Sequence, residues 1–188
     1  MHPMSVTKSE LTIYSEEIVL NKSYKLKAIL LTIIAVACLS ISAAAQQNLT
    51  FTTPDGQTVA LSSMRGNVTV LLFSGVQDPQ CRDVFKALES LAERYQGKNV
   101  RIYWVSIDPE REASNEQIKA PCGPAGSVMI LRDGSRAAFK SFEGKQMPTI
   151  VVLDQQGQLY GQPRGGFNPN SDFVNKMAAM IDSLLSRK

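Results

Sequence analysis

Residues 67–88 read NVTVLLFSGVQDPQCRDVFKAL, and this stretch decides the fold. The nearly unbroken apolar run at residues 68–73 predicts a central β-strand that is covered on both faces. The run stops at Ser74, and a helical pattern opens with Asp-Pro-Gln-Cys at residues 78–81. A cysteine near the start of such a helix lies where backbone N–H groups can stabilise a thiolate. The stretch therefore predicts a strand–turn–helix unit with Cys81 as its candidate reactive group.

The residues just before Cys81 predict how this helix begins. Asp78 is a favoured N-cap residue, and Pro79 would then occupy the first helical position, where proline is also favoured. An ionised Asp78 at that position would occupy the helix N–H groups and repel a thiolate three residues away. We therefore expect the Cys81 thiol to have an ordinary or raised pKa. Asp78 itself is interpreted either as a cap alone or as a catalytic carboxylate.

Strand and helix patterns alternate along the rest of the chain. A β-hairpin is expected at residues 49–61 around a Pro-Asp-Gly turn, and a final helix should be capped by Asn170 or Ser171. Between them the periodicity predicts further strands and short helices. The predicted strands are residues 100–107, 127–131, 149–153 and 158–161. The helix that contains Cys81 should end at Gly97, a short helix is expected at residues 136–143, and residues 110–120 should form a short helix or a loop. This order predicts an α/β sandwich around a central mixed sheet flanked by helices.

The first 45 residues differ in character from the remainder. A basic flank at residues 22–27 precedes an uncharged apolar stretch at residues 28–42, and Ala-Ala-Ala follows at residues 43–45. This order is typical of a secretory signal, because the apolar stretch is shorter than the roughly 20 residues that span a membrane. An uncleaved anchor and a lipobox ending at Cys38 are the alternatives. We expect residues 1–45 to be an extension with a signal peptide or anchor, and residues 46–188 to form one domain.

Composition excludes several kinds of site. The formal net charge is +3, and it falls to +2 without residues 1–45, which hold four Lys or Arg and three Asp or Glu. No basic run stands out, so we expect no nucleic-acid partner. His2 is the only histidine and lies outside the domain, which excludes a His general base and a His-containing zinc site there. Gly165-Gly166 is not followed by the Lys-Ser/Thr of a phosphate loop. We expect the domain to bind no metal and no cofactor.

The domain holds two cysteines, Cys81 and Cys122. Cys81 is interpreted either as a small buried hydrophobic residue or as a solitary reactive thiol. Cys122 lies in a Pro/Gly loop and is interpreted either as a residue without a role or as a resolving cysteine for Cys81. An oxidising compartment permits a disulfide between them, provided that their Cα atoms approach within about 7 Å.

Six segments in this order resemble the thioredoxin-like superfamily, and more narrowly the exported TlpA/ResA-type and AhpC/TSA thiol–disulfide redoxins. The resemblance covers residues 51–185, nearly the whole domain. It is more specific for the fold than for the activity. The segments are FTTPDGQTVALSSMRG at 51–66, the strand at 68–73, Cys-Arg at 81–82, Val-Ser-Ile-Asp at 105–108, Met-Pro-Thr at 147–149 and Leu-Asp-Gln-Gln-Gly at 153–157.

The active-site motif departs from this family. The family has Trp-Cys-x-x-Cys, whereas Gln77 and Asp78 stand here in place of the tryptophan and the first cysteine. Because a dithiol needs both sulfurs, the chain cannot run the standard cycle at this motif. Peroxiredoxins have a cysteine in a Thr-x-x-Cys motif at the corresponding helix start. This chain matches that motif only in part, because Asp78 stands in place of the threonine.

The resemblance implies the other site residues and the function. Pro148 corresponds to a cis-proline that faces the motif and leaves a backbone edge for an extended peptide, with Met147 and Thr149 beside it. We expect a divergent redoxin of extracytoplasmic thiol–disulfide homeostasis, periplasmic or anchored by residues 28–45. Its partners would be protein thiols or disulfides, extended peptides or a membrane reductase, with membrane contact only through the N-terminal segment. The alternatives are a redox-inactive peptide-binding module and a one-cysteine peroxidase that uses Cys81.

Overall fold

The computed structural model describes residues 27, 49–119, 126–166 and 168–187. The chain separates into two compact units, Met1–Ala45 and Gln46–Lys188. Within the described residues no helix has the length and apolar character needed to cross a membrane. The Cys122 segment and almost all of the predicted signal lie outside the described residues, so these two expectations remain predictions.

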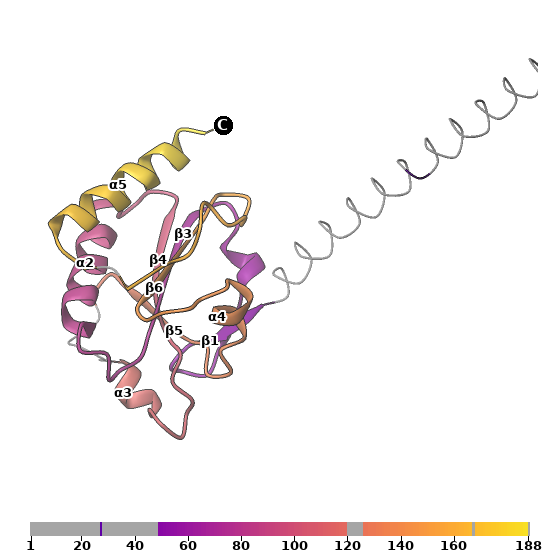
Figure 1. The fold of residues 1–188 in the computed structure, drawn as a ribbon, viewed down its shortest axis with the longest axis vertical. Helices are drawn as coiled ribbons and strands as arrows, with labels where there is room; N and C mark the ends of the chain where they lie inside the picture. Colours follow the sequence, from indigo (N-terminus) through magenta and orange to yellow (C-terminus); the bar gives the residue numbers. More distant parts are fainter. Residues whose placement is uncertain (1–26, 28–48, 120–125, 167, 188) are drawn as a thin grey trace, which may run out of the picture. The chain divides into compact units, whose positions relative to one another are not determined.

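The second unit is built on one seven-stranded sheet, in the order β2-β1-β5-β4-β3-β6-β7. β3, β4 and β5 run parallel to one another, whereas β6 is antiparallel to β3 and β1 is antiparallel to β5 (Figure 1). This is the expected α/β thioredoxin-like fold with a mixed sheet and an N-terminal hairpin. The strands are β1 (Thr50–Thr52), β2 (Thr58–Ala60), β3 (Val68–Ser74), β4 (Val100–Ser106), β5 (Met129–Arg132), β6 (Thr149–Leu153) and β7 (Arg164–Gly165).

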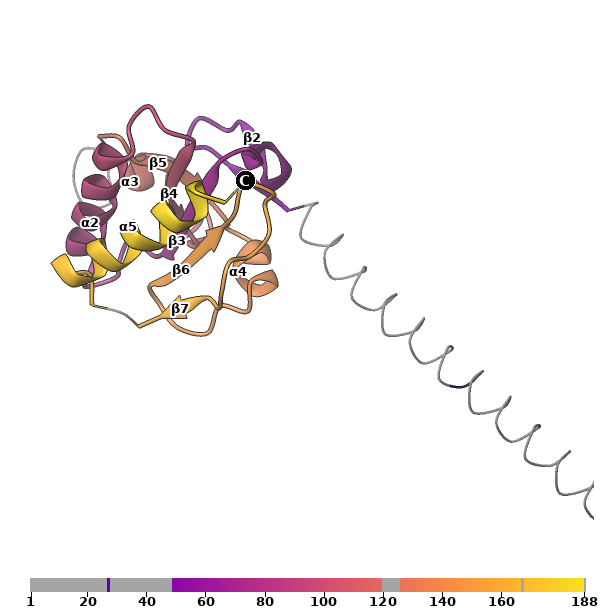
Figure 2. The ribbon, with the colours of Figure 1, turned by 90° about the horizontal axis from the view of Figure 1, so that it is seen from above.

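Helices cover both faces of this sheet (Figure 2). On one face α2 and α5 pack with Ile118 of α3 over Val70, Leu72 and Trp104 of the sheet. On the other face η1 and α4 pack over Leu71, Phe73 and Val105. Because side chains alternate along a strand, β3 supplies both cores, and every one of its residues is buried. The helical segments are η1 (Leu61–Met64), α2 (Cys81–Arg94), α3 (Asn115–Lys119), α4 (Ala137–Ser141) and α5 (Ser171–Leu185).

Residues 158–161 do not form the predicted strand. Leu159 makes a single bridge with Leu153, and the Tyr160 N–H donates to the Val152 carbonyl at 2.8 Å. The chain then turns at Gly161, whose φ of 74° lies in the left-handed region that favours glycine. The last strand of the sheet is instead β7, two residues that pair with the beginning of β6.

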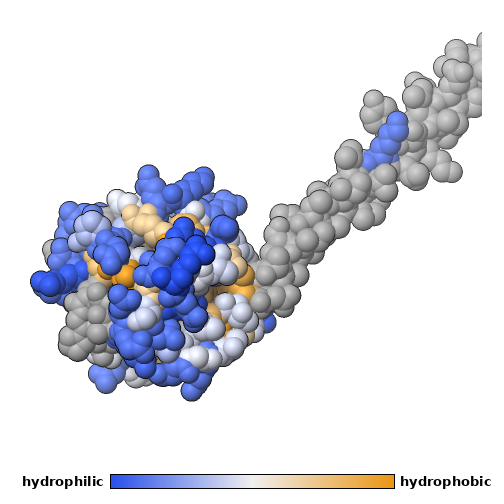
Figure 3. All heavy atoms as spheres, turned by 90° about the horizontal axis from the view of Figure 1, so that it is seen from below, coloured by the Kyte–Doolittle hydropathy of each residue, from blue (hydrophilic) through white to orange (hydrophobic). Residues whose placement is uncertain are grey.

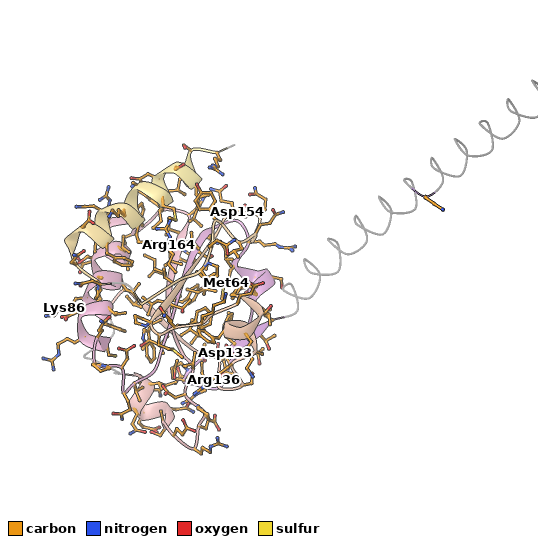
Figure 4. All side chains as sticks on the ribbon, in the orientation of Figure 1. Met64, Lys86, Asp133, Arg136, Asp154 and Arg164 are labelled. Atoms are coloured by element: carbon orange, nitrogen blue, oxygen red, sulfur yellow. The ribbon has the colours of Figure 1, made fainter. Side chains whose placement is uncertain are left out.

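The start of the last helix, α5, agrees with one of the two N-caps predicted from the sequence. Asn170 is its N-cap, and the side-chain oxygen of Asn170 accepts a hydrogen bond from the Phe173 N–H at 3.0 Å. Met177, Ile181 and Leu184 are buried against α2 and the sheet, as the helical spacing predicted. The face seen in Figure 3 is mainly hydrophilic with small separate hydrophobic areas. Lys86 of α2, labelled in Figure 4, is one of the exposed charged residues.

Candidate functional site

The site lies where three parallel strands end side by side. Ser74 of β3 is paired with Ser106 of β4, and Ser106 is paired with Arg132 of β5. All three residues are buried. The segments that leave these strands therefore meet at one edge of the sheet, which is the edge where α/β folds place their ligands.

A tight turn joins β3 to α2 at this edge. The Asp78 N–H donates to the Gly75 carbonyl at 3.1 Å, and the Cys81 N–H donates to the Asp78 carbonyl at 2.9 Å. The helix begins at Cys81 with Gln80 as its N-cap residue, so the prediction of Asp78 as N-cap and Pro79 as first helical residue is wrong. The reason is that residues 78–81 form a four-residue turn, closed by an i+3→i hydrogen bond, before the first i→i−4 bond of the helix runs from the Val84 N–H to the Gln80 carbonyl.

The Asp78 carboxylate stabilises this turn from within. Its Oδ1 accepts from the Gln80 N–H at 2.9 Å, and its Oδ2 accepts from the Ser74 hydroxyl at 3.1 Å. A side-chain oxygen that bonds the N–H two residues later is the Asx-turn arrangement. Asp78 thus fixes the geometry of the turn at the position that a cysteine occupies in the resembling redoxins.

Cys81 is buried, with 6% of its surface exposed, and it is disulfide-bonded. The two other cysteines of the chain, Cys38 and Cys122, both lie outside the described residues. The interpretation of Cys81 as a solitary thiol is therefore wrong, because its sulfur is engaged in a disulfide. A disulfide sulfur does not titrate, so the expectation of an ordinary or raised pKa applies only to the reduced protein.

A second loop faces the turn across the edge of the sheet. The Met147–Pro148 peptide bond is cis, as the resemblance implied. Pro148 is buried, whereas the Met147 side chain is 37% exposed, which is unusual for a large apolar residue. Thr149 is also buried, and its hydroxyl donates to the Gln146 carbonyl within the same loop. Of the three predicted binding residues, Met147 alone is well exposed, and Thr149 supports the loop.

The two loops border a shallow, open hollow of about 310 Å³. It is lined by Gly75, Asp78, Pro79, Ile107 and Met147. The structure therefore brings Asp78 and Met147 to one surface. Cys81, three residues after Asp78, is not among the described residues that line the hollow. Its lining combines the apolar residues Pro79, Ile107 and Met147 with Gly75 and the acidic Asp78, which suits an extended peptide better than a compact cofactor.

Asp108 is a residue of this site that the sequence interpretation did not single out. Its Oδ2 accepts from the Val76 N–H and from the Ser106 hydroxyl, both at 2.9 Å. An added Cβ on Gly75 would lie 3.0 Å from the Asp108 Oδ1, so the carboxylate packs directly against the turn. The signal was present in the sequence, because Asp108 follows β4 at the same edge at which Asp78 follows β3.

A buried arginine holds the Asp108 segment in turn. Arg132 is only 5% exposed, and its Nη1 donates to the Asp108 carbonyl at 2.7 Å. Its Nη2 donates to the Ala113 carbonyl at 2.8 Å and to the Asn115 side chain at 3.1 Å. The turn before Cys81 is thus positioned by a chain of contacts that crosses three strands. Within the described residues no group of His, Cys, Asp and Glu could hold a metal ion.

Comparison with known proteins agrees with this geometry. The model of the AhpC/TSA family matches residues 42–161, which is more than half of the chain. The chain belongs to the AhpC/TSA family. The match spans the hairpin, the turn before Cys81 and the cis-proline loop, so the whole site belongs to the part that the family shares.

Solved structures of thioredoxin-like proteins resemble this AhpC/TSA chain at low sequence identity. A protein described as a thiol:disulfide interchange protein DsbE, from Chlorobium tepidum, is 20% identical with a TM-score of 0.63, over 75% of this chain and 95% of that one. The exposed lipoprotein thioredoxin of Streptococcus pneumoniae is 17% identical with a TM-score of 0.60, over 73% and 99%. The dsbF protein of MTB is 20% identical with a TM-score of 0.59, over 72% and 97%. The comparison with curated proteins gave no match.

Proposed function

We propose that this chain is an extracytoplasmic thiol–disulfide oxidoreductase whose redox pair is Cys81 and Cys122. The observation that supports this proposal most is the disulfide at Cys81, in an AhpC/TSA chain that lacks the first cysteine of the usual motif. A second sulfur restores what a dithiol cycle needs, although it comes from a different segment.

Contacts on both sides of the Cys122 segment support Cys122 as the partner. Before the segment, Ile118 is fully buried in the core that contains Val84 and Leu88 of α2. After it, an added Cβ on Gly126 would lie 3.2 Å from the Glu89 carboxylate of the same helix. Along the chain, Cys122 is three residues from Lys119 and four from Gly126. The described residues that flank the Cys122 segment therefore lie beside α2.

The proposed reaction is disulfide exchange with a protein that binds at the hollow beside Met147. A substrate thiolate attacks the Cys81–Cys122 disulfide and forms a mixed disulfide, while the other cysteine of the pair leaves as a thiolate. A second substrate thiol then resolves the mixed disulfide, so the substrate is oxidised by two electrons and the pair is reduced. A membrane-bound or soluble disulfide partner would then oxidise the reduced pair by exchange, accepting the two electrons and restoring the Cys81–Cys122 disulfide.

Insulin reduction in the presence of dithiothreitol tests this proposal. The full chain should accelerate the precipitation of insulin, and Cys81→Ser and Cys122→Ser should each abolish the acceleration. Cys38→Ser is the matched control and should leave the rate unchanged. Full activity in Cys122→Ser would contradict the two-cysteine cycle, and an inactive parent chain would contradict the oxidoreductase proposal as a whole.

A redox-inactive peptide-binding module is the second candidate function. The observation that favours it is the hollow itself, whose walls include Met147 but not Cys81. Such a module would bind an extended peptide equally well before and after Cys81→Ser. Titration of a labelled unfolded peptide against both proteins distinguishes the two functions, because a mixed disulfide forms only in the redox case.

The extracytoplasmic location is also a proposal. It is supported by the signal-like order of residues 22–45 and by the disulfide, which persists in oxidising compartments. A fusion of residues 1–60 to alkaline phosphatase should be active in a bacterial host, whereas a fusion of residues 46–60 should not. Equal activity of the two fusions would contradict export by this segment.

A further inference from the structure

We infer that Asp78 makes the redox site selective for the charge of its thiol partner, favouring cationic over anionic thiols. This inference rests on the proposed function and adds the class of substrate to it. A protein substrate of this kind would carry Lys or Arg beside its reactive cysteine.

Among the described residues that line the hollow, Asp78 is the only ionisable one. Both of its carboxylate oxygens are held in place, by the Gln80 N–H and by the Ser74 hydroxyl. The carboxylate therefore cannot swing away from an incoming group, and it is partly exposed to the hollow. A fixed charge at a binding surface discriminates between partners by attraction and repulsion.

The charge is also close to the reacting sulfur. The turn from Asp78 to Cys81 closes with a hydrogen bond of 2.9 Å between their backbones, which places the two Cα atoms within about 7 Å. We take about 7 Å as the separation between the Asp78 carboxylate and a charge on a thiol that attacks the Cys81 disulfide. In water, two unit charges 7 Å apart change a rate by about threefold.

Other charged groups surround the site but do not take the place of Asp78. The Asp108 carboxylate lies behind Gly75 and adds negative charge. The Arg136 Nε donates to the Ile107 carbonyl at 3.3 Å, and the Arg132 Nη1 donates to the Asp108 carbonyl at 2.7 Å, so both cations are hydrogen-bonded to the backbone that follows β4. These groups stay unchanged when Asp78 alone is replaced, so a matched variant isolates its contribution.

The test compares three small thiols of similar size on the full oxidised chain: cysteamine, which carries an ammonium group, neutral 2-mercaptoethanol, and anionic 3-mercaptopropionate. Each thiolate attacks the Cys81 disulfide, and a second molecule releases the small-molecule disulfide, so two electrons pass to the protein. The rate of appearance of alkylatable Cys81 is measured by mass spectrometry. Rates are expressed relative to 2-mercaptoethanol.

In Asp78→Asn the relative rate of 3-mercaptopropionate should rise about threefold, and that of cysteamine should fall about threefold. The intrinsic reactivity of each thiol cancels in the comparison with the parent chain. Asparagine keeps the acceptor for the Gln80 N–H. An unchanged rate of reduction by 2-mercaptoethanol and an unchanged melting curve would show that the turn is intact. Glu93→Gln is the control, because it removes one exposed carboxylate about 18 Å along the helix, beyond the screening length.

Relative rates that stay within 1.5-fold of the parent in Asp78→Asn, with 2-mercaptoethanol still reactive, would overturn this inference alone. Equal shifts in Glu93→Gln would also overturn it, because they would show a general effect of net charge. A Cys81 disulfide that 2-mercaptoethanol does not reduce would overturn the proposed function and this inference together.

Discussion

Replacing Tyr95 with phenylalanine tests how firmly the helix that begins at Cys81 is held by its neighbour. Tyr95 closes α2 and is 2% exposed. Its hydroxyl lies 2.8 Å from the Ala178 carbonyl and 2.9 Å from the Asp182 Oδ1, both on α5. One hydroxyl hydrogen is therefore shared between two acceptors on the helix that packs against α2.

The magnitude follows from the acceptors. A hydrogen bond to a charged group contributes about 1.5–3 kcal/mol, but Asp182 is half exposed and also contacts Arg94 at 3.5 Å, so it remains solvated without the tyrosine. We therefore expect Tyr95→Phe to lower the free energy of unfolding by about 1–2 kcal/mol near neutral pH. The ring and its contact with Lys98 at 5.2 Å stay in place.

The dependence on pH separates this hydrogen bond from loss of packing. Burial, and then the hydrogen bond to Asp182, raise the pKa of Tyr95 from 10.0 to about 12. A pKa that is higher in the folded state means that the stabilisation is complete below about pH 10 and is lost as the pH rises from about 10 to about 12. The deficit of Tyr95→Phe should therefore shrink over that range.

Urea unfolding of both proteins at about pH 8 and about pH 11 measures this. Tyr160→Phe is the control, because the Tyr160 hydroxyl only accepts a bond from the exposed Arg187 at 3.2 Å. That variant should stay within about 0.5 kcal/mol of the parent. A Tyr95→Phe deficit that is equal at both pH values, or absent at pH 8, would refute the reasoning.

Two further predictions concern the other face of the sheet. Asp133, labelled in Figure 4, is 3% exposed, and burial raises the pKa of its carboxyl even though backbone N–H groups oppose the shift. Asp133→Asn should therefore be at least as stable as the parent at pH 7, and any advantage should disappear as the pH falls through about 4. Urea midpoints measure this, and a loss of unfolding free energy above about 1 kcal/mol at pH 7 would contradict it. In Gly144→Ala the added Cβ would lie 2.2 Å from the Phe139 ring and should cost about 1–3 kcal/mol in thermal unfolding, whereas Gly134→Ala, with its nearest neighbour at 3.5 Å, should cost far less.

The sequence predicted the parts of the fold that depend on local patterns. The continuous apolar run of β3 and the helical stripe of α5 each follow from burial of one chain segment, and both were predicted correctly. The strand predicted at residues 158–161 failed because turn geometry at Gly161 ended the pairing with β6, and alternating polarity does not encode that.

The candidate site was predicted in its residues but not in its connections. Cys81, Asp78 and Met147 were named from the sequence, and Asp78 and Met147 line one hollow. Asp108 was missed although it follows a predicted strand as Asp78 does, because its bond to the Val76 N–H joins residues 32 positions apart and the sequence does not show that pairing. The helix start was misplaced by two residues, because the turn that closes at Cys81 is a tertiary feature of the strand end.

The central claim is that Cys81 and Cys122 form one redox pair, and disulfide mapping of the intact chain tests it most directly. The native protein is alkylated without reductant, digested and analysed by mass spectrometry, and a reduced sample is analysed in parallel. We predict one cross-linked peptide pair that joins Cys81 to Cys122 and disappears on reduction. Alkylation of Cys81 without reductant, or a link from Cys81 to any other thiol, would contradict the claim.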